Sequence, residues 1–83
     1  MKYDSKIVSC FLAHQDQLFP EPVADTEEEA VYFLEDVDAV VAHSAKDVKK
    51  YFEEEGVDLE GENPLDQAEV FDVGEGRYLI VEA

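Results

Sequence analysis

The sequence predicts an α+β fold in which two helices, a strand, a third helix and a β-hairpin follow one another in the order ααβαββ. Apolar residues recur at spacings of three and four in three stretches, as on the buried face of a helix. Two runs rich in β-branched and aromatic residues flank a glycine-containing segment near the C-terminus, as in a hairpin. The chain has 83 residues, which suits a single domain over 1–83. We expect a three-stranded antiparallel sheet in the order 1-3-2 with three helices packed on it.

The first helix is expected to begin near Asp4 or Ser5, because either side chain accepts hydrogen bonds from free backbone N–H groups. Pro20 and Pro22 end the helical segment, since proline lacks a backbone N–H and restricts the residue before it. The apolar face of this helix is predicted to carry Ile7, Cys10, Phe11, His14 and Leu18.

The second helix has the clearest start in the sequence. Thr26 and Glu29 form a capping box, in which the hydroxyl bonds forward and the carboxylate reaches back. We expect this helix to end near Asp36 and the segment 38–42 to follow as a short strand. The buried stripe of the second helix is predicted to consist of Ala30, Phe33, Leu34 and Val37.

The third helix is expected to run from Ser44, which caps it, to Gly56, which ends it in a left-handed conformation. A polar loop over 58–66 follows, with one helical turn beginning at Asn63 and Pro64. The hairpin then pairs 69–73 with 77–81 across the three-residue turn 74–76. The core face of the third helix is predicted to carry Val48, Tyr51 and Phe52.

The last strand is expected at the centre of the sheet, because the segment 78–81 is apolar on both faces. Its hairpin partner carries Glu69 and Asp72, as an edge strand would. A two-layer domain covers one sheet face only. Either the first two helices cover the second face, or that face forms the interface of a symmetric homodimer.

Four stretches of the chain resemble a set of short, acidic, uncharacterised bacterial proteins. These stretches are Cys10–Leu12, Leu18–Ala24, Val40–Val41 and Gly76–Glu82. Some proteins of that set carry a glyoxalase-like label, and the glyoxalase fold pairs βαβββ modules around a metal held by His and Glu. The helix-first order of this chain differs from that arrangement, and the resemblance implies no catalytic residue.

The charge of the chain limits its partners. Twenty-two acidic residues oppose six basic ones, for a net charge of -16. Nucleic acid and anionic membrane surfaces are therefore not expected as ligands, because both are bound through Lys and Arg. A basic protein or a divalent cation fits the charge, and improved solubility alone would also explain it.

The expected location is the cytoplasm. The single cysteine, Cys10, cannot form an internal disulfide, whereas small secreted domains usually carry several. The N-terminal segment 1–6 lacks the apolar core of a signal peptide, and the longest apolar run, 78–81, is too short to span a bilayer.

The third helix carries the candidate interaction surface. Its lysines lie near the N-terminus and its glutamates near the C-terminus, which is the reverse of what the helix dipole favours. Lysine and glutamate pairs four residues apart, at 49 and 53 and at 50 and 54, offset part of that cost. Together with the loop that follows, the surface comprises Lys46, Lys49, Lys50, Glu53, Glu54, Glu55, Asp58, Glu60 and Glu62.

Few residues point to catalysis or to metal binding. His14 and His43 with a nearby carboxylate would suit a metal ion, although their spacing is not diagnostic. Cys10 lies four residues from His14, but it falls in the second turn of its helix, where the dipole no longer lowers a thiol pKa. The acidic loop over 58–66 lacks the glycine of a calcium loop at the sixth position. We therefore expect no cofactor.

The sequence favours a noncatalytic, acidic protein-binding or regulatory module. One form of this hypothesis is an inhibitor or immunity-like protein, whose carboxylates occupy the positions of phosphates on a nucleic-acid-binding enzyme. The competing hypothesis is a small metal-binding or enzymatic domain that uses His14, His43 and nearby carboxylates. A structural homodimer is the third.

Overall fold

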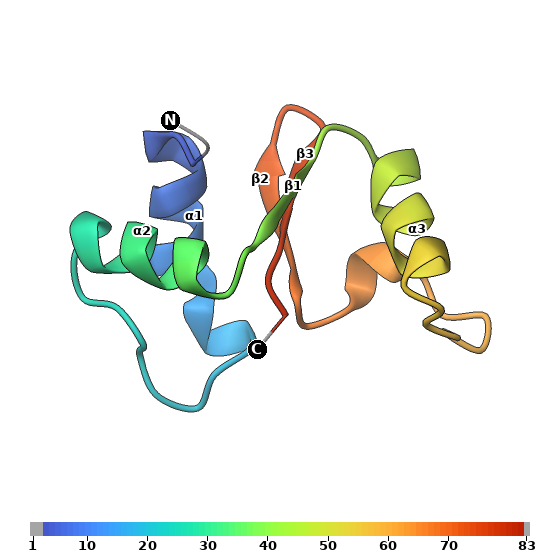
Figure 1. Ribbon diagram of the computed structural model, residues 1–83, viewed down its shortest axis with the longest axis horizontal. Coiled ribbons are helices and arrows are strands. Elements are labelled where there is room, and N and C mark those ends of the chain that lie inside the picture. Colours follow the sequence, from blue (N-terminus) through green and yellow to red (C-terminus); the bar gives the residue numbers. More distant parts are fainter. Residues whose placement is uncertain (1–2, 83) are drawn as a thin grey trace.

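A computed structural model describes residues 3–82, and it confirms the element order and the α+β class (Figure 1). The strands form one antiparallel sheet in the order β1-β3-β2, which is the predicted order. The elements are α1 (Ser5–His14), α2 (Glu27–Asp36), β1 (Val40–Ala42), α3 (Ala45–Glu54), β2 (Val70–Gly74) and β3 (Arg77–Ile80), with short 3-10 turns η1 (Gln15–Gln17) and η2 (Pro64–Asp66).

Each long helix begins at a capping side chain that the sequence predicts. The carboxylate of Asp4 accepts a hydrogen bond from the N–H of Ile7 at 3.0 Å at the start of α1. At the start of α3 the Ser44 hydroxyl accepts from the N–H of Asp47 at 3.1 Å. These bonds satisfy N–H groups that have no partner within the helix.

The capping box of α2 is also confirmed, with one difference in its return bond. The hydroxyl of Thr26 accepts from the N–H of Glu29 at 3.1 Å. The Glu29 carboxylate in turn accepts from the N–H of Asp25, at 3.1 Å, one residue before the cap. The chain that enters α2 is thereby fixed to its first turn.

The end of α3 has the predicted left-handed glycine. Gly56 has a φ of 72°, and the N–H of Val57 donates to the carbonyl of Phe52 at 3.0 Å. The N–H of Gly56 donates to the carbonyl of Glu53 at 3.1 Å, which completes a Schellman motif. The side chain of Val57 is 42% exposed, so the hydrophobic contact that often accompanies the motif is weak here.

The hairpin turn is shorter than the sequence suggests. Gly74 pairs with Arg77 across the strands, so the turn consists of Glu75 and Gly76 alone. Both turn residues have positive φ, at 57° and 78°, as a two-residue hairpin turn requires. The register shifts between Asp72 and Gly74, which leaves Val73 as an extra, buried residue on β2.

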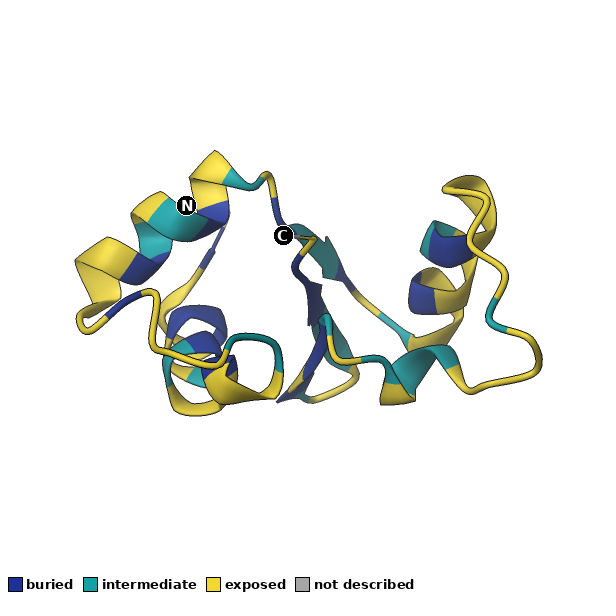
Figure 2. Cartoon of the chain, turned by 90° about the horizontal axis from the view of Figure 1, so that it is seen from below, coloured by how far each residue is buried: buried dark blue, intermediate teal, exposed yellow. Residues whose placement is uncertain are grey.

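Helices cover both faces of the sheet, as Figures 1 and 2 show. Leu79 and Val81 of the C-terminal segment pack with α1 and α2, whereas Tyr78 and Ile80 face α3 and η2. The two expected alternatives are therefore resolved in favour of internal coverage. The larger core lies under α1 and α2 and is formed by Tyr3, Ile7, Val8, Phe11, Ala24, Ala30, Leu34, Ala39, Phe71, Val73, Leu79 and Val81.

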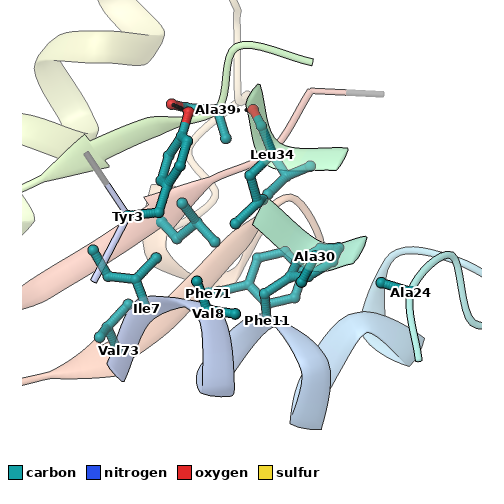
Figure 3. Packing of buried hydrophobic residues seen from close by; sticks show 12 residues of the cluster. Tyr3, Ile7, Val8, Phe11, Ala24, Ala30, Leu34, Ala39, Phe71 and Val73 are labelled. Atoms are coloured by element: carbon teal, nitrogen blue, oxygen red, sulfur yellow. Dashed lines mark hydrogen bonds between the residues drawn. The ribbon is translucent and has the colours of Figure 1, made fainter. Parts of the chain in front are cut away.

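Aromatic rings and one buried hydroxyl organise this larger core (Figure 3). The ring of Phe11 lies 5.5 Å from the rings of both Phe33 and Phe71. The hydroxyl of Tyr3 donates to the carbonyl of Ala39 at 2.6 Å and to that of Leu34 at 3.2 Å. The segment before α1 is thus joined to the end of α2.

The buried face of α1 differs from the predicted one. His14 is exposed, and Gln15 is buried instead. The face is centred on Ile7, Val8 and Phe11, so the residue one turn further on is Gln15 and not His14. The prediction was wrong there because it counted a histidine as part of the apolar stripe and left out a polar amide.

Gln15 is buried because all of its polar atoms have backbone partners. Its amide nitrogen donates to the carbonyls of Ala24, at 2.9 Å, and Leu12, at 3.3 Å. Its amide oxygen accepts from the N–H groups of Val23, at 2.8 Å, and Ala24, at 3.2 Å. One side chain thereby ties the proline-containing connector to α1.

Candidate functional site

The α3 surface is the set of nine charged residues predicted from the sequence. All nine are exposed. They lie on the outer side of α3, opposite the buried Val48 and Phe52, and on the loop that follows it. The members are Lys46, Lys49, Lys50, Glu53, Glu54, Glu55, Asp58, Glu60 and Glu62.

Only one predicted ion pair of the α3 surface forms among residues 3–82. The Nζ of Lys50 lies 3.9 Å from a carboxylate oxygen of Glu54, and both side chains are well exposed. An exposed pair of this kind contributes about 0–1 kcal/mol. Within the same described residues Lys49 forms no ion pair with Glu53. The charges of α3 are therefore largely presented to solvent.

Two other basic residues are used within the fold. Arg77 Nη1 lies 2.6 Å from Asp4 Oδ2, and Lys6 Nζ lies 2.9 Å from Glu75 Oε1. These contacts join the hairpin to the start of α1. The hydrogen bond from Arg77 lowers the pKa of Asp4, and the one from Lys6 lowers the pKa of Glu75.

The acidic residues lie at the surface almost without exception. Every Asp and Glu is exposed apart from Glu69, which is half-buried. Among residues 3–82, ion pairs engage the carboxylates of Asp4, Glu54 and Glu75. Most of the negative charge is thus not neutralised by neighbouring cations.

The histidines are exposed and lie on separate elements. His14 ends α1, while His43 lies between β1 and α3. The backbone N–H of His43 donates to the carboxylate of Asp47 at 3.3 Å. Over residues 3–82 no three or more His, Cys, Asp and Glu side chains gather closely enough to hold a metal ion.

Cys10 is held as a thiol. Its Sγ donates to the carbonyl of Asp72 at 3.3 Å. Burial, and to a lesser extent the charge of Asp72, raises the pKa of the thiol. A cysteine nucleophile needs the opposite shift, because the thiolate is the reactive form.

Side chains in the acidic loop cap their own backbone. The Asp58 carboxylate accepts from the N–H of Glu60 at 2.9 Å, and the Asn63 amide oxygen accepts from the N–H of Leu65 at 3.0 Å. Glu60 and Gly61 both have positive φ, so the loop turns sharply between these caps. These hydrogen bonds are typical of Asx turns.

The outer edge of β2 is covered by side chains from α1 and η1. The amide of Gln17 donates to the carbonyls of Ala68, at 2.9 Å, and Val70, at 2.7 Å. Further along the strand, Cys10 donates to the carbonyl of Asp72. These donors engage carbonyl groups that an added strand would need.

At the outer edge of β1, the backbone groups that flank the strand on either side are already hydrogen-bonded. Before the strand, the N–H of Ala39 donates to the carbonyl of Leu34 at 3.0 Å, and its carbonyl accepts from Tyr3. After the strand, the N–H of His43 donates to Asp47. A partner that adds a strand would find few free backbone groups here, so partner binding through side chains is favoured.

The outer face of α2 carries an exposed aromatic residue that the sequence analysis did not assign to an interaction surface. Tyr32 lies on this face and is 65% exposed, more than the other exposed large apolar residues, Val23 at 39% and Val57 at 42%. The sequence held a signal, because Tyr32 is the one aromatic residue of α2 outside its predicted buried stripe. We define the α2 patch as Glu28, Glu29, Tyr32, Glu35 and Asp36, all of which are exposed.

A shallow groove runs beside the α2 patch, between α1 and α2. Its volume is about 230 Å³. Val8 and Val31 provide its apolar lining, and a hydrogen bond of 3.5 Å from the Ser9 hydroxyl to Glu27 links the two helices nearby. The full lining consists of Ser5, Val8, Glu27, Glu28 and Val31.

Across the described residues, no helix combines the length and the apolar character needed to cross a membrane. Comparisons with protein-family models, with curated proteins and with solved structures found no match for this chain. The resemblance to short acidic bacterial proteins therefore adds no functional residue.

Proposed function

We propose that this chain is a noncatalytic module that binds a basic surface of a partner protein. The observation that supports the proposal is that the carboxylates are exposed and mostly lack ion pairs. Nearly every carboxylate is exposed, and few have a cationic neighbour among residues 3–82. Such a field attracts a basic partner over long range and makes association fast and sensitive to salt.

The scaffold suits a binding role. The covered sheet faces and the hydrogen bonds of Gln15 and Tyr3 hold the helices in place. A surface that is fixed before binding loses less conformational entropy when the partner arrives. The exposed charges on α2 and α3 therefore lie on preorganised elements.

The partner class follows from the charge. A nucleic-acid-binding protein presents Lys and Arg at the positions of phosphates, and a rigid array of carboxylates can occupy those positions. We propose an inhibitor or immunity-like role of this kind, in the cytoplasm, where the single Cys10 stays reduced. The α3 surface is the candidate contact region that the sequence predicts.

Capture of partners from a lysate at low and at high salt tests this function. The immobilised chain should retain one or a few basic proteins at low salt and release them at high salt. Three triple variants of equal net charge separate a specific site from bulk charge. They are Glu53→Gln, Glu54→Gln and Glu55→Gln on α3; Glu28→Gln, Glu35→Gln and Asp36→Asn on α2; and Asp16→Asn, Glu21→Gln and Asp25→Asn as the control.

The pattern of retention decides between binding and solubility. Weaker retention of the same protein by the α3 or the α2 variant than by the control supports a binding function with a defined site. Equal retention by all three variants contradicts it, because the charge would then act only in bulk. No retained protein at low salt contradicts it as well.

A further inference from the structure

We propose that the α2 patch and the adjoining α1–α2 groove form the docking site for an arginine-containing, partly apolar segment of the basic partner. The inference rests on the proposed binding function and assigns it to a particular surface. Three independent observations meet at this surface: an exposed aromatic ring, carboxylates that form no ion pair among residues 3–82, and an apolar groove.

The exposed ring is the first observation. Tyr32 is 65% exposed on a helix whose opposite side buries Ala30 and Leu34 completely. A polar residue would serve better at this position if the helix faced only water. Tyrosine is among the residues that contribute most to binding when a partner covers them.

The charges around the ring are the second observation. Glu28 and Asp36 lie four residues before and after Tyr32, which places all three on the same side of α2. The last turn of α2 has no basic residue, although the helix dipole favours one there. Glu35 and Asp36 thus lie at the negative end of the helix dipole, which disfavours them. Departures from local preferences, such as the charge preference at a helix end, tend to occur at functional surfaces.

The groove is the third observation. It places Val8 and Val31 beside Glu28, so an apolar strip borders the charged patch. Its volume of about 230 Å³ is below the roughly 300–1,000 Å³ of small-molecule sites. The groove has room for an aliphatic side chain of a docked segment, and Glu27 and Glu28 line it with negative charge.

Arginine fits the patch better than lysine does. A guanidinium stacks on an aromatic face and also donates paired hydrogen bonds to carboxylates. Over Tyr32 it would meet the ring and the carboxylates of Glu28 and Asp36 together. A second copy of this chain is disfavoured as the occupant, because each copy carries a net charge of -16.

The α2 patch differs from the α3 surface in both charge and position. Three lysines lie among the carboxylates of α3, whereas α2 has no basic residue at all. The two regions lie on opposite sides of the sheet (Figures 1 and 2). Substitutions in one can therefore be used as controls for the other.

Fluorescence anisotropy with three short synthetic peptides tests the inference on the intact chain. One peptide alternates arginine with leucine, the second alternates lysine with leucine, and the third contains arginine with serine in place of leucine. We expect the arginine–leucine peptide to bind most tightly. Replacement of leucine by serine should weaken binding because the groove then stays empty.

Variants locate the contact. Tyr32→Ser should reduce affinity for the arginine–leucine peptide about 5- to 30-fold, while Tyr32→Phe should retain most of it. Val57→Ser, at a partly exposed apolar residue after α3, is the matched control and should change little. Because Tyr32 lies outside the core, circular dichroism should show the same fold and melting temperature for every variant.

Each outcome bears on one of the two proposals. If Tyr32→Ser and Val57→Ser bind equally, or if all three peptides bind alike, the docking site is not the α2 patch. Binding that is weakened by the α3 triple variant instead would overturn this inference and leave the proposed function standing. If no basic peptide binds even at low salt, both proposals fail.

Discussion

Gln15 should contribute more to stability than any exposed polar side chain of comparable size. In Gln15→Ala the N–H and the carbonyl of Ala24 lose their partners, and Ala24 is only 4% exposed. Val23 is 39% exposed, so its N–H regains a hydrogen bond from water. Two buried groups without partners cost about 1–3 kcal/mol each, and partial relaxation reduces the sum to about 2–4 kcal/mol.

Thermal unfolding followed by far-UV circular dichroism measures this loss. For a domain of this size, 2–4 kcal/mol corresponds to a fall in melting temperature of about 8–30 °C. Gln67→Ala is the matched control, because within residues 3–82 the side-chain amide of Gln67 bonds to the exposed Glu62 and Asn63. It should shift the melting temperature by less than about 4 °C.

Gln17→Ala should lower the melting temperature by an amount between those for Gln15→Ala and Gln67→Ala. The amide of Gln17 donates to two carbonyls at the edge of β2 and accepts no hydrogen bond from residues 3–82. An unpaired carbonyl costs less than an unpaired N–H. If Gln15→Ala loses no more stability than Gln67→Ala, the argument that Gln15 fixes the connector is refuted.

The remaining predictions concern single side chains and salt. Tyr3→Phe should lower the free energy of unfolding by about 1–2 kcal/mol, measured by urea denaturation, because the carbonyl of Ala39 loses a buried donor; no loss would contradict this. Gly56→Ala should cost about 1–2 kcal/mol from its φ of 72° alone, since an added Cβ meets no atom within 4 Å, and a neutral result would mean that the helix end adjusts. Cys10 should react with iodoacetamide more slowly than free cysteine, and its rate should keep rising at a pH where that of free cysteine has levelled off, because burial and Asp72 raise its pKa; reaction as fast as that of free cysteine would refute the assignment. The melting temperature should rise between about 0.01 and 0.5 M NaCl, because salt screens the repulsion among carboxylates, whereas a fall would show that ion pairs contribute more than repulsion costs.

Local signals were sufficient to predict most of the fold. Thr26 and Ser44 cap helices by bonds within three residues, so the sequence alone reveals them. The position of β3 at the centre of the sheet followed from apolar residues on both of its faces. These features depend on neighbours along the chain or on simple burial.

Features that depend on distant contacts were missed. The burial of Gln15 requires the backbone of the connector to return to α1, and no pattern near Gln15 indicates that return. The turn at Glu75 and Gly76 is one residue shorter than predicted because Val73 is accommodated as an extra residue on β2.

The two candidate surfaces also differ in whether local sequence or distant contacts reveal them. Exposure of the α3 surface followed from helical periodicity for its helical residues and from the polar composition of the loop for the rest. The α2 patch needed the structure, because the groove beside Tyr32 exists only when α1 lies against α2. The reversed order of charges along the third helix had pointed instead to α3 and its loop.

The most direct test of the binding account is a titration of the isotope-labelled chain with the arginine–leucine peptide, followed by ¹H–¹⁵N correlation spectra. We predict that the largest shift changes map to α2 around Tyr32 and to Ser5 and Val8 across the groove, and that they diminish with added salt. Changes that centre on the α3 surface would contradict the assignment of the site. Changes that spread evenly over all exposed carboxylates would contradict a defined binding surface altogether.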